Sequence, residues 1–92
     1  MSNTPYDDKD YAVKYDDRYI SSESTKFAIR EEIKCIESLL KNKTSWFDAG
    51  CGTGYHLKKA KGEVHRYGLD RSAAMIDVAR TREGPEVELI VD

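Results

Sequence analysis

The spacing of apolar residues along the chain predicts a series of short helices and strands. Apolar side chains recur every three or four residues from Ile29 to Leu40, which is the spacing of one face of an amphipathic helix. Serines at positions 21, 22 and 24 can cap its N-terminus, and Asn42 can end it. We therefore expect a helix over residues 23–41 that covers one face of a sheet.

Apolar runs in the second half of the chain predict strands over residues 45–48, 64–69 and 87–91. A helix over residues 53–61 fits between the first two strands. A second helix fits before the third strand, with Ser72 as its N-cap and Gly84 at its end. Strands that alternate with helices are typical of a parallel α/β sheet.

The first residues have a different composition. Residues 1–14 are rich in Asp, Lys and Tyr and show no apolar periodicity, so we expect a polar N-terminal arm that is partly disordered. Tyrosines recur every four or five residues as far as Tyr19. This spacing fits either an amphipathic helical arm that packs through its aromatic rings or a lid over a ligand.

The most informative stretch is a glycine-rich turn after the first predicted strand. It runs Asp48-Ala49-Gly50-Cys51-Gly52-Thr53-Gly54. Asp70 follows twenty positions after Gly50, at the end of the second predicted strand. This order indicates the first βαβ unit of a nucleotide-binding sheet. Glycines let a ligand approach the backbone closely, and an acid in the position of Asp70 can accept hydrogen bonds from ribose hydroxyls.

Two classes of ligand compete for such a turn. Dinucleotide sites carry Gly-x-Gly-x-x-Gly and place a pyrophosphate at the N-terminus of the next helix. Here Tyr55 stands where that pattern expects its last glycine, and the carboxylate of Asp48 is a poor neighbour for a pyrophosphate. A cationic group is a better neighbour for the carboxylate of Asp48. S-adenosylmethionine has a sulfonium, an ammonium and a ribose but no phosphate, so an NAD(P)-dependent oxidoreductase is the less favoured alternative.

The combined motifs resemble the class I S-adenosylmethionine-dependent methyltransferase family. Residues 48–54 match its Asp/Glu-x-Gly-x-Gly-x-Gly signature, residues 67–72 its second motif and residues 74–80 the helix that follows. Residues 15–19 resemble a Tyr-Asp-x-x-Tyr/Phe pattern near the start of such enzymes. The resemblance implies a Rossmann-like α/β sheet, here an incomplete domain with strands 1–3, an N-terminal covering helix and two crossover helices.

On this resemblance, residues 15–92 form the N-terminal part of a single cofactor-binding methyltransferase domain. The implied cofactor-binding residues are Asp48, Gly50, Cys51, Gly52, Gly54, Asp70, Arg71, Met75, Asp92, Tyr15 and Tyr19. Asp70 would hold the ribose, while Arg71 and Met75 would flank the adenine. Met75 is equally expected in the core, and Asp48 can also cap the turn. No catalytic residue is assigned, because the family's substrate contacts mostly follow its fourth strand.

The expected function is transfer of a methyl group from S-adenosylmethionine to an unidentified acceptor, most simply a small molecule, leaving S-adenosylhomocysteine. The alternative is a non-catalytic or degenerate methyltransferase-like subunit that acts through a partner. The family's strand order, 3-2-1-4-5-7-6, would leave strand 1 of this piece at an open edge. We therefore expect the remainder of the chain, a second copy or a partner subunit to cover that strand.

Composition narrows the partners further. With 15 Lys and Arg against 17 Asp and Glu the net charge is −2, so no strong attraction to nucleic acid or an anionic membrane is expected. The absence of a membrane-length apolar run or a signal-peptide pattern favours a cytoplasmic protein. Cys35 and Cys51 lack the spacing of a metal or disulfide framework, and His56 and His65 lack ligand partners, so no metal is expected. His56 can approach a ligand of the glycine turn.

Overall fold

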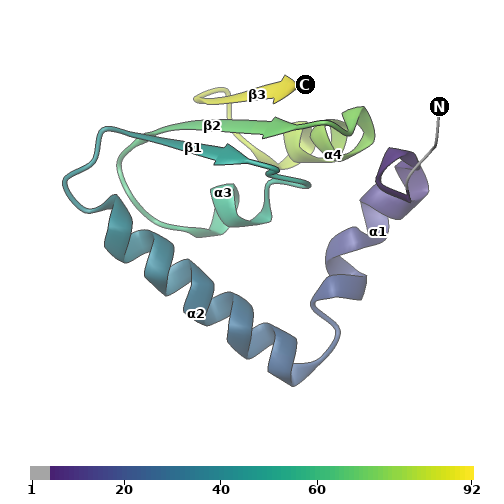
Figure 1. Cartoon of the computed structure of the whole chain (residues 1–92), viewed down its shortest axis with the longest axis horizontal. Helices are drawn as coiled ribbons and strands as arrows, with labels where there is room; N and C mark the ends of the chain where they lie inside the picture. The colour runs from purple at the N-terminus through teal and green to yellow at the C-terminus, as the bar shows by residue number, and fades with distance from the viewer. Residues whose placement is uncertain (1–4) are drawn as a thin grey trace.

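The computed structural model describes residues 5–92, except for the side chains of Pro5, Arg18 and Tyr19. Its elements are η1 (Pro5–Asp7), α1 (Lys9–Tyr19), α2 (Glu23–Leu40), β1 (Ser45–Ala49), α3 (Tyr55–Lys59), β2 (His65–Asp70), α4 (Ala73–Arg82) and β3 (Val87–Val91). They form a small α/β structure (Figure 1). No helix in this part of the chain is long and apolar enough to cross a membrane.

The strands form a three-stranded parallel sheet in the order β1-β2-β3, with β2 in the centre. Ala49 pairs with Leu69, and Asp70 pairs with Val91, so the carboxyl ends of the strands lie at one edge. The three predicted strands and the place of β1 at the edge of this sheet are confirmed. The glycine turn follows β1 and Asp92 follows β3, so both emerge beside the end of β2.

The two faces of the sheet are packed differently. Trp46, Val87 and Leu89 point to the face where α3 and α4 pack, against a core of Cys51, Leu57 and Ile76. On the opposite face Phe47 is 54% exposed and Ile90 is 42% exposed. The Phe47 ring stacks on Tyr67 with 6.4 Å between the centroids. Because parallel sheets are usually covered on both faces, this apolar face is suited to a further packing layer.

Helix α2 matches the predicted helix to within one residue. The Ser22 side chain caps its N-terminus by accepting from the Thr25 N–H, and Asn42 takes the left-handed conformation just after its end. This helix was expected to cover a face of the sheet, but its hydrogen bonds go elsewhere. Glu32 bonds His56 in α3 at 3.0 Å, and Glu37 accepts from the Lys61 N–H at 2.6 Å. Helix α2 therefore contacts α3 and the segment that follows it (Figure 1).

A partly disordered arm was expected over residues 1–14. Residues 1–4 lie outside the described part of the chain, but residues 5–14 form η1 and most of α1. Helix α1 begins at Lys9, where Asp8 Oδ1 accepts from the Tyr11 N–H at 3.1 Å. Ala12 is fully buried against α4. Aliphatic periodicity did not reveal this helix, because it packs through one alanine and several tyrosine rings.

Gly68 in β2 has no room for a side chain. A Cβ on Gly68 would stand 2.8 Å from Leu57 Cδ1, 2.9 Å from Cys51 Sγ and 2.9 Å from Leu89 Cδ2. These atoms belong to the packed core, so they have little room to move. The absence of a side chain at Gly68 is therefore what allows α3 to approach the sheet.

We predict that Gly68→Ala lowers the free energy of unfolding by about 1–3 kcal/mol, because overpacking forces the surrounding side chains to shift. Urea unfolding measures this. Gly84→Ala is the matched control, since the atoms nearest to a Cβ there belong to the carboxyl end of the flexible Glu86 side chain. Equal losses in the two variants would contradict the packing argument.

Candidate functional site

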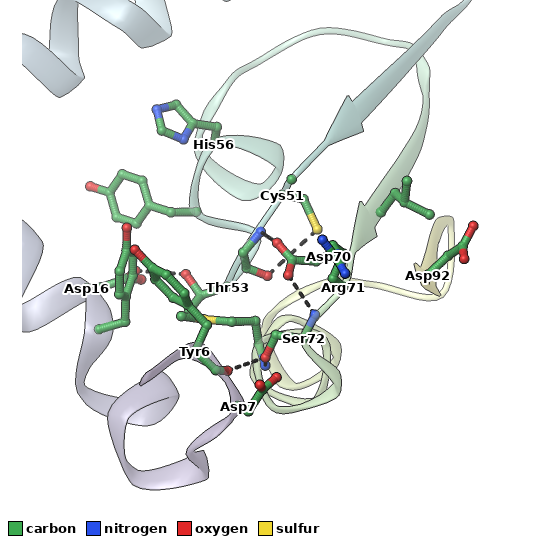
Figure 2. Close-up of a pocket in the computed structure, with 16 residues that line it drawn as sticks. Tyr6, Asp7, Asp16, Cys51, Thr53, His56, Asp70, Arg71, Ser72 and Asp92 are labelled. Carbon is green, nitrogen blue, oxygen red and sulfur yellow. Dashed lines mark hydrogen bonds between the residues drawn. The ribbon is translucent and has the colours of Figure 1, made fainter. Parts of the chain in front are cut away.

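A cavity of about 1100 Å³ opens at the carboxyl edge of the sheet, between the glycine turn, α1 and α4. Its lining consists of Tyr6, Asp7, Tyr15, Asp16, Gly50, Cys51, Gly52, Thr53, Tyr55, His56, Leu69, Asp70, Arg71, Ser72, Met75 and Asp92. Figure 2 shows how the side chains of these residues lie around it. Ligands of open α/β sheets bind at this edge, so the cavity is the candidate site.

The glycine turn has a backbone that other residues rarely adopt. Gly50, Gly52 and Gly54 have φ of 74°, 56° and 76°, which is the left-handed region. A Cβ on Gly54 would also lie 3.0 Å from Glu83 Oε1. The Leu69 carbonyl accepts from the N–H groups at Gly50 (2.7 Å) and at residue 51 (2.9 Å), which fixes the turn against β2.

Asp70 connects the turn to the start of α4. Its Oδ2 accepts from the Gly52 N–H at 2.9 Å, and its Oδ1 accepts from the Ser72 N–H at 2.9 Å (Figure 2). Ser72 in turn caps α4 by accepting from the Met75 N–H at 3.1 Å. A carboxylate has about four acceptor positions, so Asp70 keeps capacity to accept from a ligand as well.

Eight of the predicted binding residues line the cavity: Tyr15, Gly50, Cys51, Gly52, Asp70, Arg71, Met75 and Asp92. Met75 is also only 2% exposed and packs in the core with Ala12, so it both lines the cavity and belongs to the core. Burial, together with the charges of Asp48 and Asp70, raises the pKa of Cys51 to about 12. The thiol is therefore protonated at neutral pH and unreactive, which fits a small residue placed in a tight turn.

Three predicted residues stand apart from the lining. Gly54 packs behind the turn against the end of α4. The side chain of Tyr19 lies outside the described residues. Asp48 is half-buried on β1, and within the described chain its carboxylate makes no hydrogen bond, so the expected cap of the turn is not formed. Asp48 acts on the site through its charge rather than as part of the lining.

The sequence interpretation named Tyr15 from the N-terminal segment but missed its neighbours. Tyr6, Asp7 and Asp16 line the cavity from η1 and α1, and the Ser72 hydroxyl donates to the Tyr6 carbonyl. The rings of Tyr6 and Tyr15 lie edge to face with 6.1 Å between their centroids. The tyrosine spacing was the available signal for these residues. Thr53, Tyr55 and Leu69 were also missed, whereas His56 was expected near a ligand.

The lining is acidic. It contains four aspartates, at positions 7, 16, 70 and 92, and the only arginine or lysine in the described lining is Arg71. Asp48 adds a further carboxylate close enough for Asp70 to influence its pKa. Such a lining attracts a cationic group and opposes a phosphate.

Comparison with known proteins shows a shared fold. No protein-family model and no curated protein matches the chain. A matching solved chain comes from a complex between the Haloferax volcanii Trm112 methyltransferase activator and a proposed methyltransferase. The match has a TM-score of 0.61 at 19% sequence identity. It covers 100% of this chain and 40% of the other, so this chain spans about two fifths of that protein's length.

The charge on Asp48 predicts how stability depends on pH. Burial raises the pKa of Asp48 most; the nearby His56 lowers it and the carboxylate of Asp70 raises it. The folded chain thus keeps this proton to a higher pH than the unfolded chain, and the ionised form opposes folding at neutral pH. We predict that Asp48→Asn is more stable than the wild type at pH 7, and that the gain disappears as the pH falls toward about 3.9.

Urea unfolding at pH 7 and at pH 4 measures this difference. Asp77→Asn is the matched control, because Asp77 is exposed on α4. A variant Asp48→Asn that is less stable than the wild type at pH 7 would show that the carboxylate has a stabilising partner.

Proposed function

We propose that the cavity binds S-adenosylmethionine and that the chain supplies the cofactor-binding part of a class I methyltransferase domain. One observation carries the proposal: a left-handed glycine turn is held by the strand-end acid Asp70, inside an acidic cavity at the carboxyl edge of a parallel sheet. The turn lets a ligand approach the backbone, and Asp70 supplies ribose acceptors. The other aspartates favour a cation.

Different residues of the site contact different parts of this ligand. The ribose hydroxyls donate to Asp70, and the adenine lies between Arg71 and Met75 with Asp92 near its amino group. The sulfonium and ammonium lie toward the glycine turn, where Asp48 supplies negative charge. Tyr15 covers the ligand from α1.

Methyl transfer requires mainly that the acceptor atom, the methyl carbon and the sulfur are aligned. The acceptor atom attacks the methyl carbon in line with the C–S bond, and that bond breaks with its electron pair going to sulfur, which leaves S-adenosylhomocysteine. A small-molecule acceptor is the proposed substrate class. The acidic lining and Tyr55 in place of a third Rossmann glycine disfavour an NAD(P)-dependent oxidoreductase.

A second candidate is a methyltransferase-like subunit that does not catalyse the reaction itself and acts through a partner. The solved complex that contains the similar chain joins an activator to a proposed methyltransferase, and this supports a partner more directly than it supports catalysis by the present chain. The unpaired edge of β1 and the exposed face around Phe47 offer a surface for such a partner.

Calorimetry with S-adenosylhomocysteine tests the ligand. We predict that Asp70→Ala weakens binding by about 1.5–3 kcal/mol, the usual loss for hydrogen bonds to a charged group, and that Asp70→Asn costs less. Asp77→Ala, an exposed change on α4, controls for charge alone. Binding of NADH without binding of S-adenosylhomocysteine would contradict the proposal, and an unchanged affinity in a folded Asp70→Ala variant would remove Asp70 from the site.

Sedimentation and hydrogen exchange test the need for a partner. We predict that residues 1–92 alone transfer no methyl group and protect the β1 amides only when a second copy, further chain or a partner subunit covers that edge. A monomer with protected amides at Trp46 and Phe47 and measurable methyl transfer would contradict this prediction.

A further inference from the structure

A polar cluster at the wall of the cavity joins three separate elements. Thr53 of the glycine turn donates from Oγ1 to Asp16 Oδ1 in α1, at 2.7 Å (Figure 2). Arg82, the last residue of α4, donates from Nη1 to Asp16 Oδ2. The same Nη1 lies 3.4 Å from Thr53 Oγ1. The carboxylate of Asp16 therefore bridges the turn and the C-terminus of α4.

This cluster is largely withdrawn from water. Thr53 is 2% exposed, and the side chains of Asp16 and Arg82 are 12% and 30% exposed. A polar group that loses its partner in such a place keeps its desolvation cost, so removal of one member is more costly than the net value of the contact. The cluster thus specifies one position of α1 against the turn.

The packing of α1 on α4 is apolar and aromatic. Ala12 is its buried aliphatic side chain, while Val13 is 56% exposed. Tyr11 and Tyr15 pack at the edge of the α4 core, and their rings lie 6.0 Å apart. Since Tyr15 and Asp16 both line the cavity, any displacement of α1 moves part of its wall.

We propose that Asp16, Thr53 and Arg82 form a latch that fixes α1 to the glycine turn and so holds Tyr15 over the cavity. Asp16 and Thr53 are then positioning residues: they set where the wall stands, and through the turn they also restrain the backbone between Gly52 and Gly54. The effect on α1 is independent of which ligand binds, whereas the effect on affinity rests on the proposed S-adenosylmethionine site.

Substitutions at Thr53 test the latch with little change in volume. Thr53→Val removes the hydroxyl, and Thr53→Ser keeps it. Thr81→Val is the matched control, because the Thr81 hydroxyl donates to the Val78 carbonyl within α4 at 2.6 Å and is not part of the cluster. Hydrogen exchange of the α1 amides is measured in the unliganded chain, and affinity for S-adenosylhomocysteine is measured by calorimetry. Circular dichroism confirms that each variant is folded.

The latch predicts that Thr53→Val speeds exchange in α1 about tenfold and weakens S-adenosylhomocysteine binding about tenfold, as expected for a lost hydrogen bond to a charged group. Thr53→Ser restores both values, and Thr81→Val changes neither. Asp16→Asn, which keeps the shape but removes the charge, speeds α1 exchange in the same way. Unchanged α1 exchange in both Thr53→Val and Asp16→Asn would overturn the latch. Faster exchange in a chain that binds no S-adenosylhomocysteine would support the latch and contradict the proposed function.

Discussion

The site depends on the two hydrogen bonds that the Asp70 carboxylate accepts from backbone N–H groups. One comes from Gly52 in the turn after β1, and the other comes from Ser72 at the start of α4. Asp70, at the end of β2, thereby links the glycine turn that follows β1 to the start of α4, which follows β2. The left-handed glycines make this geometry possible, because a side chain at Gly52 would oppose the backbone conformation that points its N–H at Asp70.

This arrangement gathers negative charge at a place where the protein partly excludes water. Asp48 lies near Asp70 and has a raised pKa, and Glu83 behind the turn also has a raised pKa because of burial. Glu83 Oε1 is buried without a hydrogen-bond partner in the described structure. Carboxylates held in this way destabilise the unliganded chain, and a bound cation offsets part of that cost. Under the proposed function, stability and ligand binding are therefore opposed at Asp48.

The sequence predicted the sheet and the centre of the site because these follow from local patterns. A short apolar run indicated each strand. Ser72 and Asn42 are residue types that favour helix ends, so they indicated where α4 begins and where α2 ends. The spacing of the motif identified Asp70, Gly50 and Gly52, which line the cavity. The wall formed by Tyr6, Asp7 and Asp16 was missed because α1 is held by tyrosine packing and by contacts to residues far away in the chain, such as Arg82. The position of α2 was also predicted wrongly, because the apolar face of a helix does not specify the element against which it packs.

The most direct test of the account is a crystal structure of the chain, with any partner that covers β1, grown with S-adenosylhomocysteine. The account predicts that the ribose hydroxyls lie within hydrogen-bond distance of the Asp70 carboxylate while its bonds to Gly52 and Ser72 are kept. The amino-acid end of the ligand should lie over the glycine turn. A ligand bound elsewhere on the molecule, or a cavity that stays empty at a saturating concentration, would contradict it.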